Sequence, residues 1–170
     1  TKINFGELYQ NIALPLLHGA TYLLLNRFLP GGRGLENTKY LLSVDEINKM
    51  FDIAEEVLER AGIYGNVGTE LPYCIIRHPE RYKRLQIASL CAAAKSFFVI
   101  DPSGYVKVCN HSPTRLCKWT ELDRLEQNDY WQKFASRDYI PAMCKGCRYL
   151  GTKCDGGCRE AAHVYFGNIT

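Results

Sequence analysis

CKGCRYLGTKCDGGC, residues 144–158, holds four of the eight cysteines of this chain in one short segment. They are Cys144, Cys147, Cys154 and Cys158, and the glycines between them let the backbone turn tightly around something small. Thiolates this close repel one another unless a cation lies among them or they pair as disulfides. The segment therefore predicts an iron–sulfur cluster, a zinc site or a set of disulfides.

Two further cysteines lie upstream at a spacing that suits a cluster. Cys91 precedes a predicted hairpin whose turn is DPSG at residues 101–104, and Cys109 lies on the return strand. Cys158 stands directly before a short helix predicted over residues 159–166, where the helix dipole favours a thiolate. An iron–sulfur core is normally held by four thiolates, which one turn cannot supply, so distant segments have to contribute. This spacing favours iron–sulfur over zinc, and zinc over disulfides.

The whole pattern, Cys-x12-Gly-x4-Cys followed by Cys-x2-Cys-x6-Cys-x3-Cys, resembles the SPASM domain at the C-terminus of many radical S-adenosylmethionine enzymes. The resemblance covers residues 72–167 and includes VIDPSGYVKVC at 99–109 and GGCREAA at 156–162. Six residues follow Cys147 where the family has five. The resemblance implies a small cysteine-rich α+β domain, with a β-hairpin and short helices, that binds two auxiliary [4Fe-4S] clusters.

The resemblance also implies which cysteines hold each cluster. The first auxiliary cluster, nearer the preceding domain, would be held by Cys91, Cys109 and Cys158. Its fourth ligand would be Cys74 or, alternatively, Cys117, and we favour Cys74 because Pro72 holds it beside the end of that domain. The second auxiliary cluster would be held by Cys144, Cys147 and Cys154. One iron of the second cluster would then lack its expected cysteine.

The first part of the chain has a different character. Its apolar pattern predicts helix, strand, loop, helix and strand at residues 5–19, 21–29, 31–40, 43–62 and 63–71. Ser43 and Glu46 form a capping box at the start of the second helix, and Gly62 ends it. Helices that alternate with strands favour a parallel α/β unit with a right-handed crossover.

This first part resembles the last elements of the partial (β/α)6 barrel that precedes the SPASM domain in those enzymes. The expected fold class is therefore α/β, the end of a partial barrel at residues 1–71, followed by the SPASM/Twitch domain at residues 72–170. Asn26, Arg27 and Arg33 lie where a late barrel strand would end, and that edge of a barrel faces the active site. We expect these three residues to contact S-adenosylmethionine or substrate.

Two parts of the family's pattern are missing. No Cys-x3-Cys-x2-Cys occurs, so the cluster that cleaves S-adenosylmethionine is not in this sequence, and the final SPASM cysteine is absent as well. We therefore expect the C-terminal portion of a longer oxidoreductase, inactive without its N-terminal barrel portion. The resemblance implies a peptide or protein substrate, with the auxiliary clusters binding substrate or transferring an electron. The alternatives are a zinc-ribbon-like binding module and a stand-alone electron-transfer domain.

Charge and hydropathy argue against several other classes of function. The formal net charge is +3 and no run of Lys or Arg stands out, so nothing favours a nucleic-acid partner. No apolar stretch reaches the roughly 18 residues of a membrane span, and no secretory signal peptide is recognisable. We accordingly expect a cytoplasmic location without a membrane partner, which favours metal ligation over disulfides.

Overall fold

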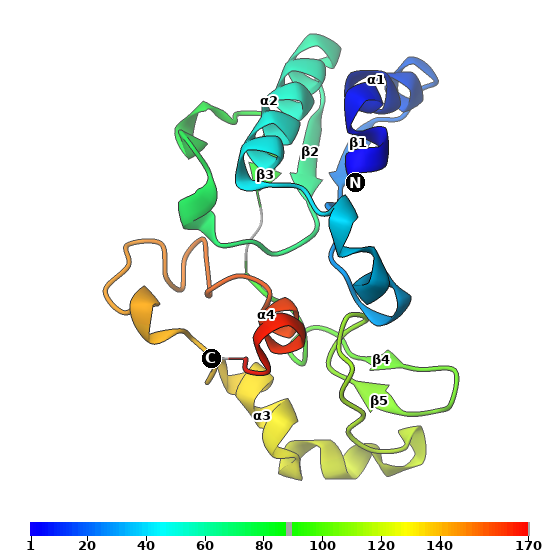
Figure 1. Ribbon diagram of the computed structural model, residues 1–170, viewed down its shortest axis with the longest axis vertical. Coiled ribbons are helices and arrows are strands. Elements are labelled where there is room, and N and C mark those ends of the chain that lie inside the picture. Colours follow the sequence, from blue (N-terminus) through cyan, green and yellow to red (C-terminus); the bar gives the residue numbers. More distant parts are fainter. Residues whose placement is uncertain (88–89, 170) are drawn as a thin grey trace.

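The computed structural model describes residues 1–87 and 90–169. The first part contains a parallel sheet of strands β1 (Tyr22–Leu25), β2 (Tyr64–Val67) and β3 (Leu85–Ile87), in the order β1-β2-β3. The register pairs Tyr22 with Tyr64 and Gly65 with Leu85. All three strands therefore end at the same edge of the sheet, above the cysteine-rich region in Figure 1.

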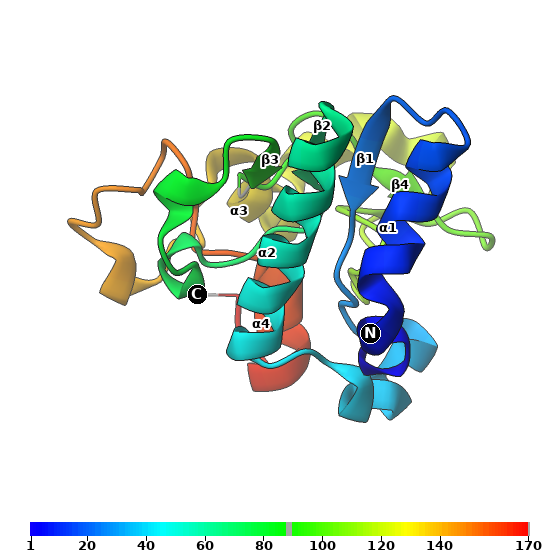
Figure 2. The same cartoon turned by 90° about the horizontal axis from the view of Figure 1, so that it is seen from above.

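Helices α1 (Leu8–Leu17) and α2 (Val44–Ala61) lie side by side on one face of this sheet, as Figure 2 shows. The predicted capping box of α2 is confirmed: Glu46 N–H donates to Ser43 Oγ at 3.2 Å, and Ser43 N–H donates to Glu46 Oε2 at 2.7 Å. Gly62 ends α2 in the left-handed conformation, with φ at +69°. On the opposite face of the sheet, the side chains of Tyr22, Leu24 and Tyr64 are exposed.

The second part is built from short elements. Strands β4 (Val99–Ile100) and β5 (Val106–Lys107) form the predicted antiparallel hairpin, and Gly104 N–H donates to the Asp101 carbonyl at 2.8 Å to close its turn. A 3-10 helix η5 (Trp119–Gln127) and helix α3 (Asp129–Ser136) follow. The chain then runs through the cysteine segment into α4 (Arg159–Phe166), which lies between the hairpin and the sheet in Figure 1.

Two hydrophobic clusters hold these parts together. The first lies between the parallel sheet and α2 and includes Phe51, Leu58, Val67 and Leu85. Cys154 also belongs to this cluster, although it is distant in sequence from the other members. The second cluster forms under α3 and includes Val108, Phe134 and Tyr139, with Cys91 and Cys109 packed against it. Both predicted cysteine sites therefore rest on apolar cores.

The coarse fold class is confirmed, because helices combine with a small parallel and a small antiparallel sheet. The described residues form no closed barrel. Residues 31–40, which we expected to be a loop, instead contain the 3-10 helix η2 (Gly32–Tyr40). The sequence analysis did not predict β3, because three residues carry too little periodicity to indicate a strand.

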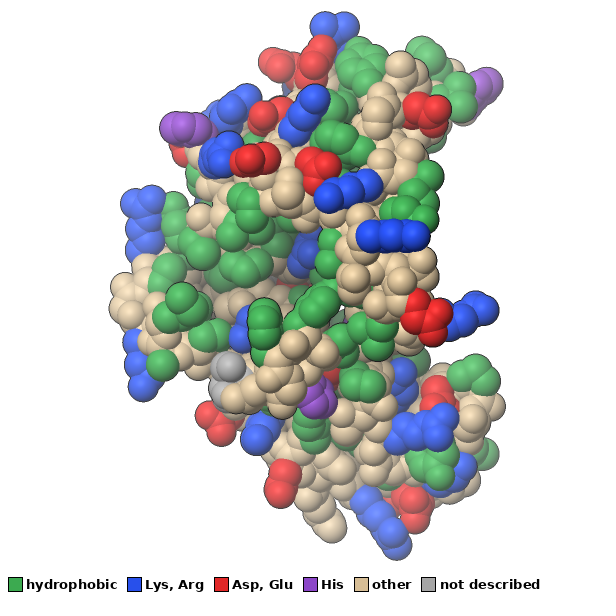
Figure 3. Space-filling model, in the orientation of Figure 1, with side chains coloured by type: hydrophobic (Ala, Val, Ile, Leu, Met, Phe, Trp, Pro, Cys, Tyr) green, Lys and Arg blue, Asp and Glu red, His purple; other side chains and the backbone are tan. Residues whose placement is uncertain are grey.

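No helix among the described ranges 1–87 and 90–169 is long and apolar enough to cross a bilayer. Figure 3 shows Lys and Arg side chains interspersed with Asp and Glu over this face of the molecule. Hydrophobic side chains are also visible on the same face, around the middle of the molecule. The view therefore shows no extended basic patch.

Candidate metal centres

Arg27 connects the end of the parallel sheet to the cysteine-rich region. It follows β1, and its backbone N–H donates to Thr69 Oγ1 at 3.3 Å, just beyond the end of β2. Its Nη2 donates to the Glu70 carbonyl at 2.7 Å, and its buried Nε has no hydrogen-bond partner among the described residues. Burial lowers the pKa of Arg27, whereas the negative charges of Cys158 and Glu70 act to raise it. The guanidinium therefore lies within the electrostatic reach of Cys158.

Cys91, Cys109 and Cys158 form the first cysteine group. Burial raises the pKa of the Cys91 and Cys109 thiols to about 12 each, and the charge of Cys158 contributes to both increases. Burial also raises the pKa of Cys158 itself. The three thiols come from different segments: a loop, the chain just after β5, and the start of α4. The charge of Cys158 nevertheless raises the pKa of both other thiols. Cys158 therefore lies within electrostatic range of the other two thiols, and the shared ligand role of the three stays a prediction.

Backbone amides near these sulfurs favour the thiolate form. Burial is the largest influence on all three pKa values and raises them, but the amide of Ala93 acts to lower the pKa of Cys91. The amide of Ala161, in the first turn of α4, acts in the same direction on Cys158. Hydrogen bonds to the sulfurs are one of the means by which proteins tune iron–sulfur clusters. The first cysteine group thus has the donors that a negatively charged cluster would need.

Cys144, Cys147 and Cys154 form the second cysteine group. Cys154 is buried, Cys147 is exposed and Cys144 is intermediate. Burial raises the pKa of Cys144, and the charges of Cys154, Cys147 and Cys74 raise it further. Gly156 N–H donates to Cys154 Sγ at 3.3 Å. This group therefore reaches from the solvent to the edge of the first hydrophobic cluster.

Cys117 lies in a different environment. Its carbonyl accepts the N–H of Val106 at 2.9 Å, which places it beside β5. Burial raises the pKa of Cys117, and the nearby charges that act on it are those of Glu121, Asp123 and Arg124. Cys117 is therefore within electrostatic range of the charged residues of η5.

The three residues expected to bind S-adenosylmethionine or substrate do not share one location. Asn26 is exposed and follows β1, where its side chain lies against Gly68. Arg27 is partly buried, donates to the Glu70 carbonyl and is within electrostatic range of Cys158. Arg33 lies exposed in η2, and its carbonyl accepts a hydrogen bond from Asn37 Nδ2 at 3.1 Å. Asn26 and Arg27 are thus at the end of the parallel sheet, whereas Arg33 belongs to the neighbouring helix.

Sequence reasoning missed two acidic residues at the first cysteine group. Asp155 is fully buried, and its Oδ2 accepts the N–H of Cys91 at 2.8 Å and the hydroxyl of Tyr139 at 3.1 Å. The negative charge of Glu70 acts on both Cys91 and Cys158, and burial raises the pKa of Glu70. Asp155 could have been noticed because it directly follows Cys154. Glu70, by contrast, does not adjoin a cysteine in the sequence, so no sequence pattern indicated it.

All eight cysteines are free thiols. Among the residues that the structure describes, no group of three or more His, Cys, Asp or Glu side chains is arranged to hold a metal ion. A four-iron core is larger than a single ion and keeps its thiolate ligands farther apart. Such a core is held by soft thiolates, which is the donor type present in both cysteine groups.

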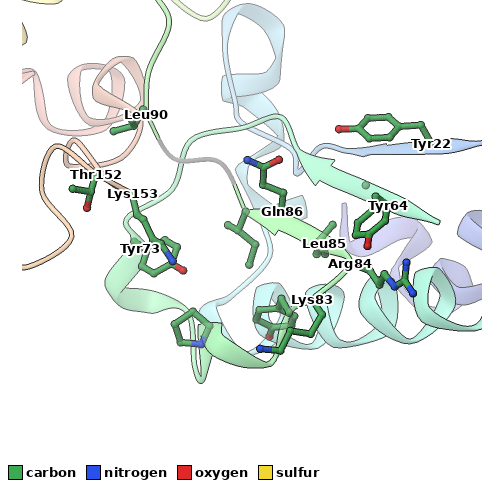
Figure 4. A pocket seen from close by; sticks show the side chains of 14 residues that line it. Tyr22, Tyr64, Tyr73, Lys83, Arg84, Leu85, Gln86, Leu90, Thr152 and Lys153 are labelled. Atoms are coloured by element: carbon green, nitrogen blue, oxygen red, sulfur yellow. The ribbon is translucent and has the colours of Figure 1, made fainter. Parts of the chain in front are cut away.

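A pocket of about 740 Å³ lies beside the second cysteine group. It follows β3 through residues 82–87 and extends to Tyr22 and Tyr64 at the start of the neighbouring strands. Figure 4 shows Tyr73 and Lys153 at one end and Tyr64 with Arg84 at the other. Aromatic rings and cationic side chains therefore line a cavity of the size that proteins use to bind small ligands or several residues of a peptide.

No protein family model, no curated protein and no solved structure matches this chain. The geometry described above is therefore what bears on its function.

Proposed function

We propose that this chain is the auxiliary-cluster portion of a radical S-adenosylmethionine enzyme, with the last elements of a partial barrel joined to a SPASM domain. The observation that supports this proposal is that the charge of Cys158 acts on both Cys91 and Cys109, although the three thiols come from distant segments. Arg27 and Glu70, just beyond the ends of the parallel strands, are within electrostatic range of Cys158 as well, and ligands of open parallel sheets bind at that edge. Two [4Fe-4S] clusters, one at each cysteine group, account for the cysteine content of both sites.

The buried charges near the first group fit such a cluster. A [4Fe-4S] core with thiolate ligands carries net negative charge, and, when bound, it would supply one-electron chemistry. Arg27 offers a partly desolvated cation within electrostatic range of Cys158, and its Nε–H has no hydrogen-bond partner among the described residues. Because Arg27 cannot lose its proton at physiological pH, its charge would persist and offset that of the cluster. Arg27 is therefore assigned here to the auxiliary cluster or to a substrate bound beside it.

The substrate class proposed is a peptide or protein side chain. The pocket along β3 supports this, because it is elongated along a strand at the edge of the described sheet and has room for several side chains. Lys83, Arg84 and Lys153 give the lining a positive character that suits an acidic segment. Thr152 and Lys153 belong to the cysteine segment, so a peptide bound in the pocket would lie beside the second cysteine group. S-adenosylmethionine and the cleaving cluster would come from the N-terminal barrel portion.

A cytoplasmic location is part of the same proposal. Iron–sulfur ligands have to remain thiols until the metal is inserted, and the cytosol keeps thiols reduced. All eight cysteines are free in the structure, which agrees with this requirement.

Anaerobic purification followed by iron and sulfide analysis tests the function. Two [4Fe-4S] clusters give about eight irons per chain and a broad visible absorption that bleaches on reduction. Cys109→Ala should lower the iron content by half, because it removes a ligand of the first cluster only. Met143→Ala is the matched control, since Met143 is 90% exposed and adjoins Cys144 without a ligand role. Colourless protein with stoichiometric zinc after anaerobic preparation would overturn the proposal in favour of a zinc module.

A further inference from the structure

The turn that follows the parallel strands lies directly against the cysteine segment. Tyr73 N–H donates to Cys154 Sγ at 3.5 Å, although 81 residues separate the two. The rings of Tyr73 and Tyr149 are 4.7 Å apart between centroids, and Lys153 Nζ lies 5.5 Å from the Tyr73 ring centroid. Tyr73 is buried, whereas the side chain after it, Cys74, is exposed.

Backbone contacts at a second point fix the same approach. A Cβ atom added at Gly157 would lie 2.8 Å from Pro72 Cδ and 2.9 Å from Pro72 N, so only glycine permits this contact. Gly157 has φ at +79°, a conformation that side chains also disfavour. The two residues before Cys74 are therefore held against the 154–157 segment by two independent contacts.

The turn is also anchored from behind. Tyr73–Ile75 forms the 3-10 helix η3, and the buried Asn48 of α2 donates from Nδ2 to the Ile75 carbonyl at 2.9 Å. Asn48 Oδ1 accepts the N–H of Arg77 at 2.7 Å. Because Asn48 holds the backbone directly after Cys74, helix α2 fixes the position of the segment that carries this thiol. The charge of Cys74 acts on Cys144, together with those of Cys147 and Cys154.

The geometry points to Cys74 as the fourth ligand of the second site, which would complete a set of four thiolates with Cys144, Cys147 and Cys154. This inference rests on the proposed function and specifies one of its ligands. Sequence alone favoured the first site for Cys74, because Pro72 places it beside the end of the preceding domain. The contact of Tyr73 with Cys154 Sγ leads instead to the second site, whereas the contact of Pro72 with Gly157 lies beside Cys158 and does not distinguish the sites. The first site then keeps its three cysteines, with its fourth position not supplied by Cys74.

This ligand set has a chemical consequence for the second cluster. With three cysteines one iron would remain open to water or to a small molecule, whereas four thiolates would leave no open position. The second cluster would then bind no substrate through iron, and its role would be limited to electron transfer. Two amides, from Tyr73 and Gly156, donate to Cys154 Sγ at 3.5 and 3.3 Å and would help to set its potential.

The decisive experiment uses Cys109→Ala as a background in which only the second site can hold a complete cluster. Anaerobically reconstituted Cys109→Ala protein is expected to hold about four irons per chain. Adding Cys74→Ala should leave one iron of the second cluster without a thiolate, so that mild oxidation releases about one iron per chain and gives a three-iron electron paramagnetic resonance signal that Cys109→Ala alone does not give. If Cys74 belonged to the first site, the double variant would keep an intact four-iron second cluster, and that result would overturn the inference.

Two control variants distinguish a wrong assignment of Cys74 from a folding defect. Cys74→Ser and Met143→Ala in the same background test for a folding defect, and circular dichroism should show the same helix content in all variants. Cys74 is exposed, so its removal leaves no cavity in either hydrophobic cluster. Wild-type protein without iron would refute the proposed function itself. Wild-type protein with eight irons, combined with a double variant that retains its four-iron cluster, would refute only the assignment of Cys74.

Discussion

The carboxylate of Asp155 accepts the backbone N–H of Cys91 at 2.8 Å and so ties the two cysteine-bearing segments of the first site together. Asp155 lies between the second cysteine group and Cys158, and Cys91 lies 64 residues earlier. The same oxygen accepts the Tyr139 hydroxyl, and Arg137 Nε is 3.7 Å away. A fully buried carboxylate thus sets the position of a proposed ligand without contacting its sulfur.

Asp155→Ala should destabilise the protein substantially. It leaves the buried N–H of Cys91 and hydroxyl of Tyr139 without an acceptor, and each unsatisfied group costs about 1–3 kcal/mol. We expect the free energy of unfolding to fall by about 2 kcal/mol or more, measured by urea denaturation. Asp155→Asn keeps one acceptor oxygen and should lose less. Equal stability of the alanine variant and the wild type would show that the carboxylate does not hold Cys91.

Gly157→Ala should damage the contact between the turn at Pro72 and the cysteine segment. Gly151→Ala is a matched control, since Gly151 lies in the same segment with φ at +76° but has nothing within 4 Å of an added Cβ. Both variants carry the left-handed backbone cost of about 1–2 kcal/mol, and only Gly157→Ala adds the clash with Pro72. Thermal unfolding should therefore show a larger loss for Gly157→Ala. Equal losses would contradict the close approach of Pro72.

The metal-free protein should lose stability in alkaline solution. Burial raises the pKa of Cys109 from 9.0 to about 12, so the folded state keeps a neutral thiol where the unfolded state ionises. The stabilisation is complete below about pH 9 and is lost as the pH rises toward about 12. Urea midpoints measured at intervals across this range should decline less in Cys109→Ala. Cys147→Ala, which removes an exposed thiol, is the control, and equal slopes for the two variants would argue against burial of Cys109.

Arg27→Met should shift the reduction potential of the first cluster to a more negative value. Reduction adds an electron, and removing a nearby cation makes the reduced state less favourable. Potentiometric titration of the reconstituted protein measures the shift, and Arg27→Lys should restore part of it by returning the charge. Arg84→Met is the control, because Arg84 stacks on Tyr64 near the start of the strands, 4.7 Å from the ring centroid. An unchanged potential in Arg27→Met would place the first cluster out of reach of Arg27.

Short-range sequence patterns were sufficient to predict several elements of the fold. The capping box at Ser43, the end of α2 at Gly62 and the hairpin turn at 101–104 depend on residues a few positions apart, and all three are confirmed. Helix α4 likewise begins directly after Cys158, as its sequence predicts. These features could be predicted because the interactions that form them lie within one turn of the chain.

Features that depend on distant contacts could not be predicted in this way. Strand β3 exists because β2 offers it a partner, and η2 replaces the expected loop in a segment whose glycines gave no helical signal. The buried position of Asp155 depends on where Cys91 and Tyr139 come to lie. The sequence also could not indicate that the turn before Cys74 lies against Cys154, since that depends on Asn48 and on the hydrogen bond from Tyr73.

The amino-acid sequence by itself determined the number and spacing of the thiols, the ends of α2, the start of α4 and the hairpin, because short-range chemistry fixes these. Only the tertiary structure decided which distant segments lie against one another and which buried charges surround the thiols. Such contacts arise when apolar surfaces far apart in the chain are buried together, and a local sequence pattern cannot predict which surfaces these will be.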